Sequence, residues 1–390
     1  MPGVSFSDNG GMTSASHSSD SAEPFEGLRI RGVAKTFGTD TTVLNEIDLD
    51  VHPGELISLV GSSGTGKSTL LRIIAGLEEP SAGRVTYAGQ PLERGSVGVV
   101  FQRPILYPHL SVKDNILFPT RLGAFAGRVD MDYYRELLEA LKLEGLESRK
   151  PSQLSGGQAQ RVGIARALIR RAPVVLFDEP LASVDEEMSA SIRADIVRLH
   201  ERYGFTGLYV THDQNEALML GQRVAVMDAG YLVQVDTPER LLAHPHTLQV
   251  AKLLAAPALN LVTLEDSAVL PVGCELAIRA TALCPVAADA AHSLPVQVLG
   301  SRHLVGGMLY RARLLEAVSL PLESGRASAD SELSARMYAR VRAGQELEFF
   351  IPDAQGTSLI GASLSAGERV HLSVAAERCF LFSEGKRFYL

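Results

Sequence analysis

The 390-residue chain has no run of roughly 18 consecutive apolar residues, the length that a membrane-spanning helix needs. Residues 1–24 are rich in Ser, Gly and Asp and have neither a basic start nor an apolar core. We therefore expect a disordered tail there and no secretion signal. The net charge is −8, and no stripe of Lys and Arg with interleaved aromatic residues occurs. This composition argues against nucleic acid as a main partner.

Cysteine is also scarce, with only Cys274, Cys284 and Cys379. Their number is odd, all three lie late in the chain, and their spacing is not that of a metal site. Such usage fits a reduced cytosolic compartment, and we assign the thiols no chemistry. The length predicts more than one domain, and a hydrophobic content of 46% is enough for a sizeable core.

One glycine-rich segment carries the strongest signal. Residues 61–68 read Gly-Ser-Ser-Gly-Thr-Gly-Lys-Ser, follow the apolar run Glu55–Val60 and lead into the helical run Thr69–Ala75. In a phosphate-binding loop of this form, glycines let backbone N–H groups and a helix start face a polyphosphate. We expect Lys67 to reach the β- and γ-phosphates and Ser68 to ligate Mg²⁺. An ordinary glycine-rich turn is the alternative, which the flanking strand and helix disfavour.

A second segment indicates what completes this site. Leu154–Gln158 reads Leu-Ser-Gly-Gly-Gln, and Ser155 and Gln158 have the spacing of a capping box before a helical apolar pattern. A helix start accounts for the serine, but we see no structural need for two glycines and a glutamine. Bare N–H groups, a hydroxyl and a positive helix end make a site for a terminal phosphate. Because the phosphate loop already serves one side, we expect this segment to act on the nucleotide of another copy.

With these segments the chain resembles the ATP-binding subunit of an ABC transporter, over about residues 28–262. The phosphate loop matches the family's Walker A motif, and Leu154–Gln158 matches its signature motif. The apolar strand Val174–Phe177, followed by Asp178 and Glu179, resembles the Walker B motif. The resemblance implies that Asp178 holds Mg²⁺, directly or through water, and that Glu179 polarises the attacking water.

Four further residues match family motifs. Gln102 matches the Q-loop glutamine that senses metal or water, and Asp185 lies in the D-loop. His212, after the strand Leu208–Thr211, matches the switch histidine near the γ-phosphate. Phe37 lies where the family stacks an aromatic ring on adenine. Taken singly, a histidine after a strand or a lone aromatic is more often a surface or core residue. The joint order of the motifs favours the functional interpretation.

The resemblance therefore implies a full set of site residues. Those expected to be catalytic are Glu179, His212 and Gln102. Those expected to bind ATP are Phe37, Gly61, Ser62, Ser63, Gly64, Thr65, Gly66, Lys67, Ser68 and Thr69. Those of the signature, acting on the partner's ATP, are Leu154, Ser155, Gly156, Gly157 and Gln158. The metal ligands are Ser68, Gln102 and Asp178, and the D-loop residue is Asp185. Two molecules of Mg-ATP would lie between two copies in a head-to-tail dimer.

Alternating apolar strands and helices predict an α/β fold with a mostly parallel sheet, and the resemblance makes it a P-loop NTPase over residues 25–262. The region of about residues 103–165 reads more helical and would be the family's helical subdomain. The expected strands lie near Leu28–Val33, Glu55–Val60, Val97–Phe101, Val174–Phe177, Leu208–Thr211 and Arg223–Asp228. The expected helices lie near Lys67–Gly76, Met131–Leu141, Gln158–Ala172, Glu187–Tyr203 and Asn215–Leu220.

The composition changes near Ala256 and Pro257, and short alternating segments beyond it suggest a small β-barrel. In similar importers this region, here 263–390, is an OB-like all-β accessory domain of the TOBE type. Ala277–Leu283 lacks the proline and acidic pair that often open it, which leaves a regulatory role open. The expected strands are Glu275–Arg279, Val296–Gly300, Met308–Leu314, Glu346–Ile351, Val370–Val374 and Cys379–Phe382.

A separate ATPase chain with a β-rich C-terminal part resembles an importer subunit. The resemblance implies two transmembrane permease subunits, an indirectly coupled extracytoplasmic solute-binding protein, and a peripheral location on the cytoplasmic face of the inner membrane. Pro104–Leu110 is suited to receiving a helix of a permease, although a packed proline-rich loop is the alternative. Tyr107–Leu110, Asp114–Ile116 and Tyr209–Gln214 resemble the group that serves sugars, polyamines, iron or oxyanions. We expect a sugar or a polyamine, with iron or an oxyanion as the alternative.

Two other classes of function use similar loops. A soluble ABC ATPase acting on nucleic acid or ribosomes usually has two ATPase modules or coiled-coil arms, whereas this chain has one phosphate loop and no sustained heptads. A small-molecule kinase would not need Leu154–Gln158.

Overall fold

The computed structural model describes residues 25–121, 129–264, 274–290, 292–322, 337–352, 364–375 and 379–387. The tail expected over residues 1–24 lies outside these ranges.

The central sheet has six strands, and five of them are parallel. They are β3 (Leu56–Val60), β6 (Gly98–Val100), β7 (Val174–Asp178), β8 (Thr206–Thr211), β9 (Arg223–Asp228) and β10 (Tyr231–Asp236). The order is β10-β9-β3-β8-β7-β6, with only β10 antiparallel to its neighbour. Strands β3 and β8 are buried along their whole length, as strands covered on both faces must be. The predicted mostly parallel sheet is confirmed.

Helices cover both faces of this sheet. They include α1 (Lys67–Ile74), α4 (Gly156–Leu168), α5 (Glu186–Tyr203) and α6 (Gln214–Leu220). Alternate residues of β7 and β8 enter opposite apolar clusters, because successive side chains of a strand point to opposite faces. Phe177 and Tyr209 join the cluster with α4 and α5, whereas Leu176 and Val210 join the cluster with α1.

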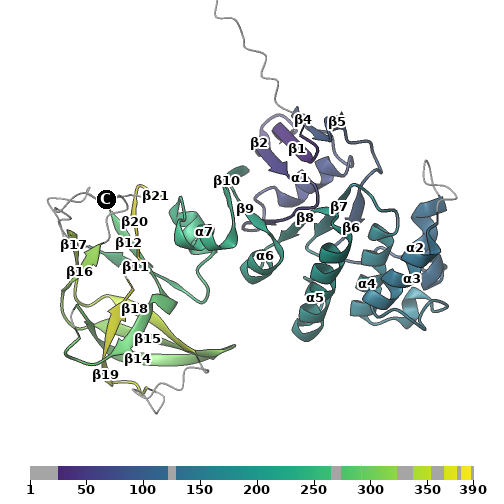
Figure 1. Cartoon of the computed structure of the whole chain (residues 1–390). Coiled ribbons are helices and arrows are strands. Elements are labelled where there is room, and N and C mark those ends of the chain that lie inside the picture. Colours follow the sequence, from purple (N-terminus) through teal and green to yellow (C-terminus); the bar gives the residue numbers. More distant parts are fainter. Residues whose placement is uncertain are drawn as a thin grey trace, which may run out of the picture.

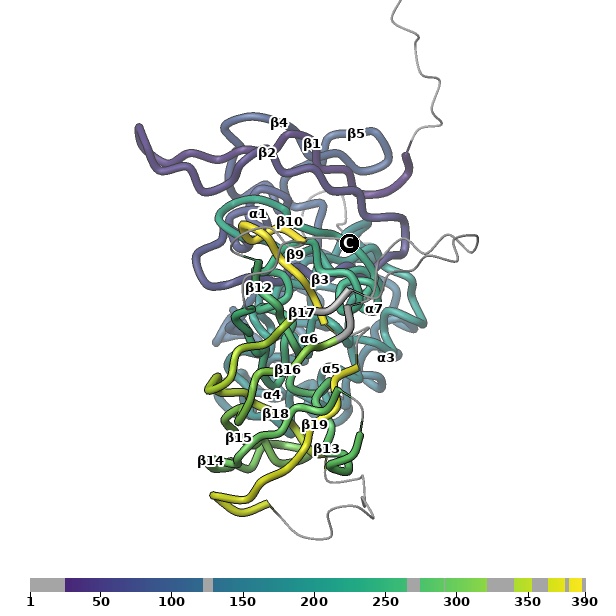
Figure 2. The backbone as a smooth tube through the Cα atoms, turned by 90° about the vertical axis from the view of Figure 1, so that its left-hand side faces the viewer, coloured from purple at the N-terminus to yellow at the C-terminus, as the bar shows by residue number. Residues whose placement is uncertain are grey.

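An antiparallel sheet lies beside the α1 face, at one end of the molecule (Figure 2). Its strands are β1 (Leu28–Phe37), β2 (Thr41–Val51), β4 (Ala82–Tyr87) and β5 (Gln90–Pro91), in the order β2-β1-β4-β5. The sequence predicted only the first part of β1 and missed β2. Leu44, Ile47 and Leu49 of β2 are buried, whereas residues between them are partly or fully exposed, so the strand has one apolar face.

The region between Gln102 and α4 is helical, as predicted. It contains α2 (Val112–Leu117), α3 (Met131–Ala140) and short 3-10 turns at Phe118–Arg121 and Pro151–Gln153. Ser111 caps α2 and Asp130 caps α3, each by accepting hydrogen bonds from backbone N–H groups. Figure 1 shows α2, α3 and α4 on one side of the molecule.

The C-terminal part is all β after two short helices, α7 (Pro238–Ala243) and α8 (Leu248–Leu253). Figure 1 shows these strands on the side opposite α2 and α3. The described pairings form three sheets, β11-β12-β20-β21, β13-β19-β14-β15-β18 and β16-β17, so a closed OB-like barrel stays a prediction. The bounds are β11 (Leu259–Thr263), β12 (Glu275–Arg279), β13 (Leu283–Val286), β14 (Leu294–Leu304), β15 (Gly307–Leu314), β16 (Val318–Leu322), β17 (Met337–Val341), β18 (Glu346–Pro352), β19 (Arg369–Val374), β20 (Cys379–Ser383) and β21 (Lys386–Arg387), with a 3-10 turn at Ala280–Ala282.

The start of this β region differs slightly from the expected boundary at residue 263. Strand β11 begins at Leu259 and pairs with β12, so the β region starts earlier along the chain. Helix α8 packs on it, since Leu248 and Ala251 share an apolar cluster with Phe380 and Phe382.

Candidate functional site

The predicted site residues follow the carboxyl ends of neighbouring parallel strands. The register pairs Val60 of β3 with Thr211 of β8, Val210 of β8 with Asp178 of β7, and Phe177 with Val100 of β6. The segments after these four strands therefore meet at one edge of the sheet, where open α/β sheets bind ligands. They carry the phosphate loop, His212, Glu179 and Gln102.

The phosphate loop joins β3 to α1, and two of its glycines cannot be replaced without strain. Gly66, which precedes α1, has φ +97°, a left-handed conformation that glycine tolerates best. A Cβ atom there would lie 2.6 Å from Leu44 Cδ2. At Gly61 a Cβ atom would lie 2.4 Å from the Met227 carbonyl oxygen. At Gly61 and Gly66 the loop expected to bind phosphates therefore has a backbone conformation or close contacts that exclude any residue with a Cβ atom.

Lys67 is buried beneath this loop. Its Nζ atom donates hydrogen bonds to the carbonyl oxygens of Gly61, at 2.8 Å, and Ser62, at 2.9 Å. Burial lowers the pKa of the Lys67 ammonium, and the nearby carboxylates of Glu179 and Asp178 oppose that shift. The ammonium is therefore held at the loop by two uncharged carbonyl oxygens, which an anionic ligand can replace.

Ser68 and Asp178 form the part of the site that suits a metal. The Ser68 hydroxyl donates to Asp178 Oδ1 at 3.2 Å. Burial raises the pKa of Asp178, the Ser68 hydrogen bond opposes this shift, and the Glu179 charge adds to it. A hydroxyl and a carboxylate are oxygen donors of the kind Mg²⁺ takes, and a cation would relieve the buried negative charge. These residues fit Mg²⁺.

Glu179 and His212 contact each other across this edge. His212 Nδ1 lies 3.1 Å from Glu179 Oε2. Glu179 has φ 44°, an uncommon value for a residue with a side chain, and its amide donates to the Val210 carbonyl oxygen at 2.9 Å. Residues held in such conformations concentrate at functional sites. The strained backbone of Glu179 therefore lies at the residue whose carboxylate contacts the His212 imidazole.

Gln102 and Phe37 are less tightly placed. Gln102 is exposed just beyond β6, and among the described residues no hydrogen bond joins its side chain to Asp178 or Ser68. Phe37 ends β1 and is 42% exposed, with Lys35 Nζ 4.9 Å from its ring centroid. Phe37 is thus not a core residue, and its ring is open to a ligand.

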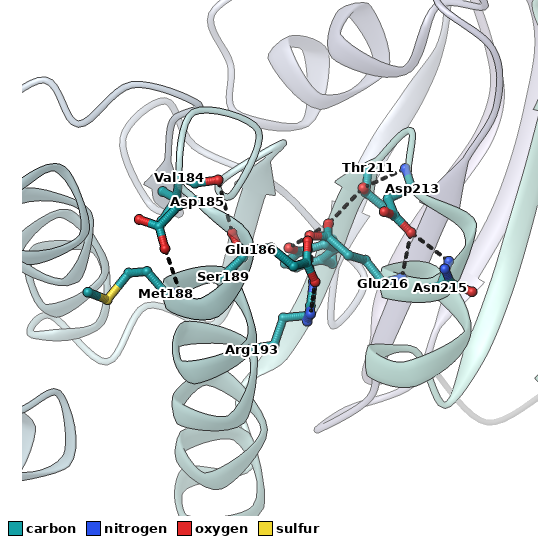
Figure 3. Close-up of polar contacts among 11 residues, drawn as sticks. Val184, Asp185, Glu186, Met188, Ser189, Arg193, Thr211, Asp213, Asn215 and Glu216 are labelled. Carbon is teal, nitrogen blue, oxygen red and sulfur yellow. Dashed lines mark hydrogen bonds and ion pairs between the residues drawn. The ribbon is translucent and has the colours of Figure 1, made fainter. Parts of the chain in front are cut away.

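The signature and the D-loop residue lie at helix starts. Ser155 caps α4, and its hydroxyl and the Gln158 side chain form the predicted capping box. In the part of the chain that the structure describes, no hydrogen bond or ion pair joins Leu154–Gln158 to the phosphate loop of the same chain. Asp185 caps α5 by accepting from the Met188 amide at 3.0 Å, as Figure 3 shows.

One detail of the signature prediction was wrong. A Cβ atom on Gly157 would lie 2.5 Å from Met188 Cγ of α5, so close packing gives this glycine a structural reason. A Cβ atom on Gly156 would meet nothing within 4 Å. Gln158 also has a structural role, since its side-chain oxygen accepts from the Ser155 amide at 3.0 Å. Of the two glycines and the glutamine, Gly156 alone has no such structural role.

A hollow of about 620 Å³ adjoins the phosphate loop. Ser62 and His212 line one side, and Gln249 and Lys252 of α8 line the other. Its walls therefore come from both the α/β part and the helix that packs on the C-terminal strands.

The sequence interpretation missed a buried carboxylate, Glu216, close to His212. Its Oε2 atom accepts hydrogen bonds from the Thr211 hydroxyl at 2.8 Å and the Tyr209 hydroxyl at 3.2 Å. The sequence does contain a signal for this residue. Glu216 follows His212 by about one helical turn and lies on the face of α6 that packs on the sheet.

Among the described residues, every helix is too short or too polar to cross a membrane.

The comparisons with known proteins agree with this geometry. The family model described as ABC transporter matches residues 44–182. The sn-glycerol-3-phosphate import ATP-binding protein UgpC 1 of Rhizobium johnstonii is 44% identical over 250 residues, which cover 62% of this chain and 67% of the relative. The UgpC protein of Escherichia coli K12 is 42% identical over 243 residues, covering 61% and 68% respectively.

A solved structure has the same fold. The cbiO1 protein of Clostridium perfringens, described as part of the ABC transporter complex cbiONQ, aligns with a TM-score of 0.51 and 27% identity. The alignment covers 57% of this chain and 92% of that one. The α/β part described above is thus an ABC ATPase fold. The chain belongs to the ATPases of the ABC transporter family, among its import ATP-binding proteins.

Proposed function

We propose that this chain hydrolyses Mg-ATP at the interface between two of its own copies and thereby drives solute import through two permease subunits. The observation that carries the proposal is the convergence of Lys67, Asp178, Glu179 and His212 at one sheet edge, with Glu179 Oε2 and His212 Nδ1 3.1 Å apart. A carboxylate next to an imidazole, beside a buried ammonium, suits the transfer of a phosphoryl group to water.

Hydrolysis of ATP needs positioning and charge neutralisation more than covalent chemistry. Lys67 exchanges its carbonyl partners for the β- and γ-phosphate oxygens, while the glycine-rich backbone donates N–H groups to them. Ser68 and Asp178 would hold Mg²⁺, with Gln102 as a further ligand, and the bound ion would supply positive charge that offsets the charge of the phosphates. Glu179 orients the attacking water and accepts its proton, and His212 contacts the γ-phosphate.

The second copy supplies what one chain lacks. Ser155, Gly156 and Gly157, at the positive end of α4, would bind the γ-phosphate held by the partner's phosphate loop, with Asp185 at the same interface. The absence of any hydrogen bond from this segment to its own phosphate loop, among the described residues, supports the composite arrangement. Two ATP molecules close the dimer, and hydrolysis removes the attraction and opens it. Phe37, exposed at the end of β1, stacks on adenine.

The permease contact is assigned to Pro104–Leu110. Ile105 is 61% exposed, whereas the buried Asn115 side chain accepts from the Tyr107 amide at 2.7 Å and donates to the Tyr107 carbonyl oxygen at 3.1 Å. The loop is therefore fixed in shape while presenting apolar side chains, as a receiver for a helix of a permease should. The same contact places the chain peripherally on the cytoplasmic face of the inner membrane. An extracytoplasmic solute-binding protein joins only indirectly.

The strands from β11 onward form the TOBE-type accessory domain, and the ATP-binding domain is the part before them.

For the cargo we propose a compound of the sugar class, in its phosphorylated form, because the curated relatives are named for sn-glycerol-3-phosphate import. Neither of the two relatives described above is named for import of a polyamine, iron or an inorganic oxyanion.

Reconstitution tests the function as a whole. The chain, its cognate permease subunits and the binding protein are placed in vesicles, and uptake of labelled sn-glycerol-3-phosphate is followed with and without Mg-ATP. ATP-dependent uptake that Glu179→Gln abolishes is expected. ATP hydrolysis without any permease association would instead favour a soluble ATPase.

A further inference from the structure

The buried Glu216 carboxylate joins two segments of the site that lie on different elements. On one side, it accepts from Thr211 and Tyr209 at the end of β8, directly before His212. On the other side, Glu216 Oε1 lies 3.4 Å from Arg193 NH1 of α5. Glu216 is 7% exposed and the Arg193 side chain 14%, so little water competes for either group.

Arg193 extends this contact to the start of α5. Its second terminal nitrogen, NH2, lies 3.0 Å from Oε1 of Glu186, an exposed side chain in the residue next to Asp185. Figure 3 shows Glu186 and Glu216 converging on Arg193 from two elements. The planar guanidinium forms both contacts at once, which a lysine ammonium on a single stem could not do with the same geometry. We refer to Glu216, Arg193 and Glu186 as the Arg193 bridge.

The turn that holds His212 is fixed on the Glu216 side. The Asp213 amide donates to Thr211 Oγ1 at 3.0 Å, and Asp213 Oδ1 accepts from the Glu216 amide at 3.1 Å. Thr211 therefore contacts the residue after the histidine as well as the Glu216 carboxylate. Glu216 therefore contacts the residues on both sides of His212, Thr211 through its carboxylate and Asp213 through its amide.

We propose that the Arg193 bridge positions His212 relative to the Asp185 segment. A change at the interface with the second copy would then alter the position of His212 in the same chain. The proposal rests on the function proposed above, since Asp185 is assigned to the interface and His212 to the γ-phosphate. Arg193 and Glu216 are positioning residues, because they act through His212 and not on substrate. Loss of the bridge leaves ATP binding intact and misplaces His212 for hydrolysis.

The test compares Arg193→Gln and Arg193→Lys with Arg202→Gln. Arg202 also lies on α5 and forms an ion pair, 3.3 Å from Glu136 Oε2, at the end of the helix away from Asp185. Amide hydrogen exchange is measured on the full chain without nucleotide, over residues 182–189 and 211–217. Steady-state kcat and KM for ATP are measured on the same preparations.

Arg193→Gln is expected to speed exchange in 211–217, a segment that it does not alter, and to lower kcat by about tenfold with KM changed less than about twofold. Arg193→Lys keeps the positive charge but lacks the planar guanidinium with two terminal nitrogens. It should change the exchange rate and kcat in the same direction, but less. Arg202→Gln should show neither effect. Unchanged exchange in 211–217, or a kcat loss matched by Arg202→Gln, overturns the proposal. If the wild-type chain hydrolysed no ATP, the proposed function would fail, whereas the exchange comparison would still decide the link between the segments.

Discussion

His212 Nδ1 and Glu179 Oε2 are 3.1 Å apart although the two residues follow different strands of the central sheet. The Glu179 amide donates to the Val210 carbonyl oxygen, which places the glutamate beside the end of β8 and next to the histidine. The parallel register of β7 and β8 therefore brings the pair together.

Glu179→Gln should abolish hydrolysis while leaving ATP binding intact. The amide keeps the size of the side chain but cannot accept a proton from water, so kcat should fall by at least about 100-fold. Steady-state ATPase assays and binding of a fluorescent ATP analogue measure the two effects. Glu187→Gln, at an exposed carboxylate on α5, serves as the control. A normal rate for Glu179→Gln would show that another group activates the water.

Lys67→Ala should weaken ATP binding. The buried ammonium would otherwise make charge-assisted hydrogen bonds to phosphate, each worth roughly 1.5–3 kcal/mol, which corresponds to about a 10- to 100-fold loss in affinity. Isothermal titration with Mg-ATP measures this change, with Lys142→Ala, at an exposed lysine, as the control. An unchanged dissociation constant would remove Lys67 from the phosphate site.

The two signature glycines should respond differently to alanine. Gly156→Ala meets open space and should change the free energy of unfolding by less than about 0.5 kcal/mol, yet it should slow hydrolysis because the methyl group faces the partner's phosphate. Gly157→Ala meets the flexible Met188 side chain at 2.5 Å and should lower stability more. Urea unfolding and ATPase assays on both variants check this. Equal stabilities, or full activity of Gly156→Ala, would contradict it.

Glu55 should stabilise the fold in a pH-dependent way. Burial raises the pKa of this carboxyl, but hydrogen bonds from Arg223 and the His52 amide outweigh that effect and leave the pKa below its ordinary value of 4.5. A carboxyl with a depressed folded-state pKa contributes stability above its unfolded pKa, and this contribution disappears as the pH falls through the folded value.

Glu55→Gln should therefore lower the free energy of unfolding by about 2 kcal/mol at neutral pH. The difference from the wild type should shrink as the pH falls below 4.5, and urea unfolding across this range measures it. A difference that stayed constant with pH would mean that the Arg223 ion pair contributes nothing.

The sequence predicted the central sheet and the strand and helix around the glycine-rich loop because both rest on local patterns. The run Val174–Phe177 is short, apolar at every residue and begins with two valines, which favours a buried strand. The glycine-rich loop needs a strand before it and a helix after it. The helix Lys67–Ile74 ends close to the predicted Gly76. These features depend on residues that are neighbours along the chain.

Features that depend on distant partners could not be predicted. Strand β2 was missed although Ile47, Leu49 and Val51 alternate with two aspartates. Its backbone pairs with β1, and its buried residues pack in the cluster with α1. The packing of Gly157 on Met188 and the contact of Arg193 with Glu216 join helices or loops that are far apart in sequence. Nothing local in the sequence marks either pair.

The central claim, that each ATP site contains residues of two copies, is tested most directly with purified mixed dimers carrying two different tags. In the first dimer, one copy has Glu179→Gln and the other Gly156→Arg. In the second dimer, both changes are on one copy and the other copy is wild type. A composite site leaves one intact site in the first dimer and none in the second, so we predict ATP hydrolysis by the first only. Hydrolysis by the second dimer alone would show that each site lies within one chain, and would contradict the account.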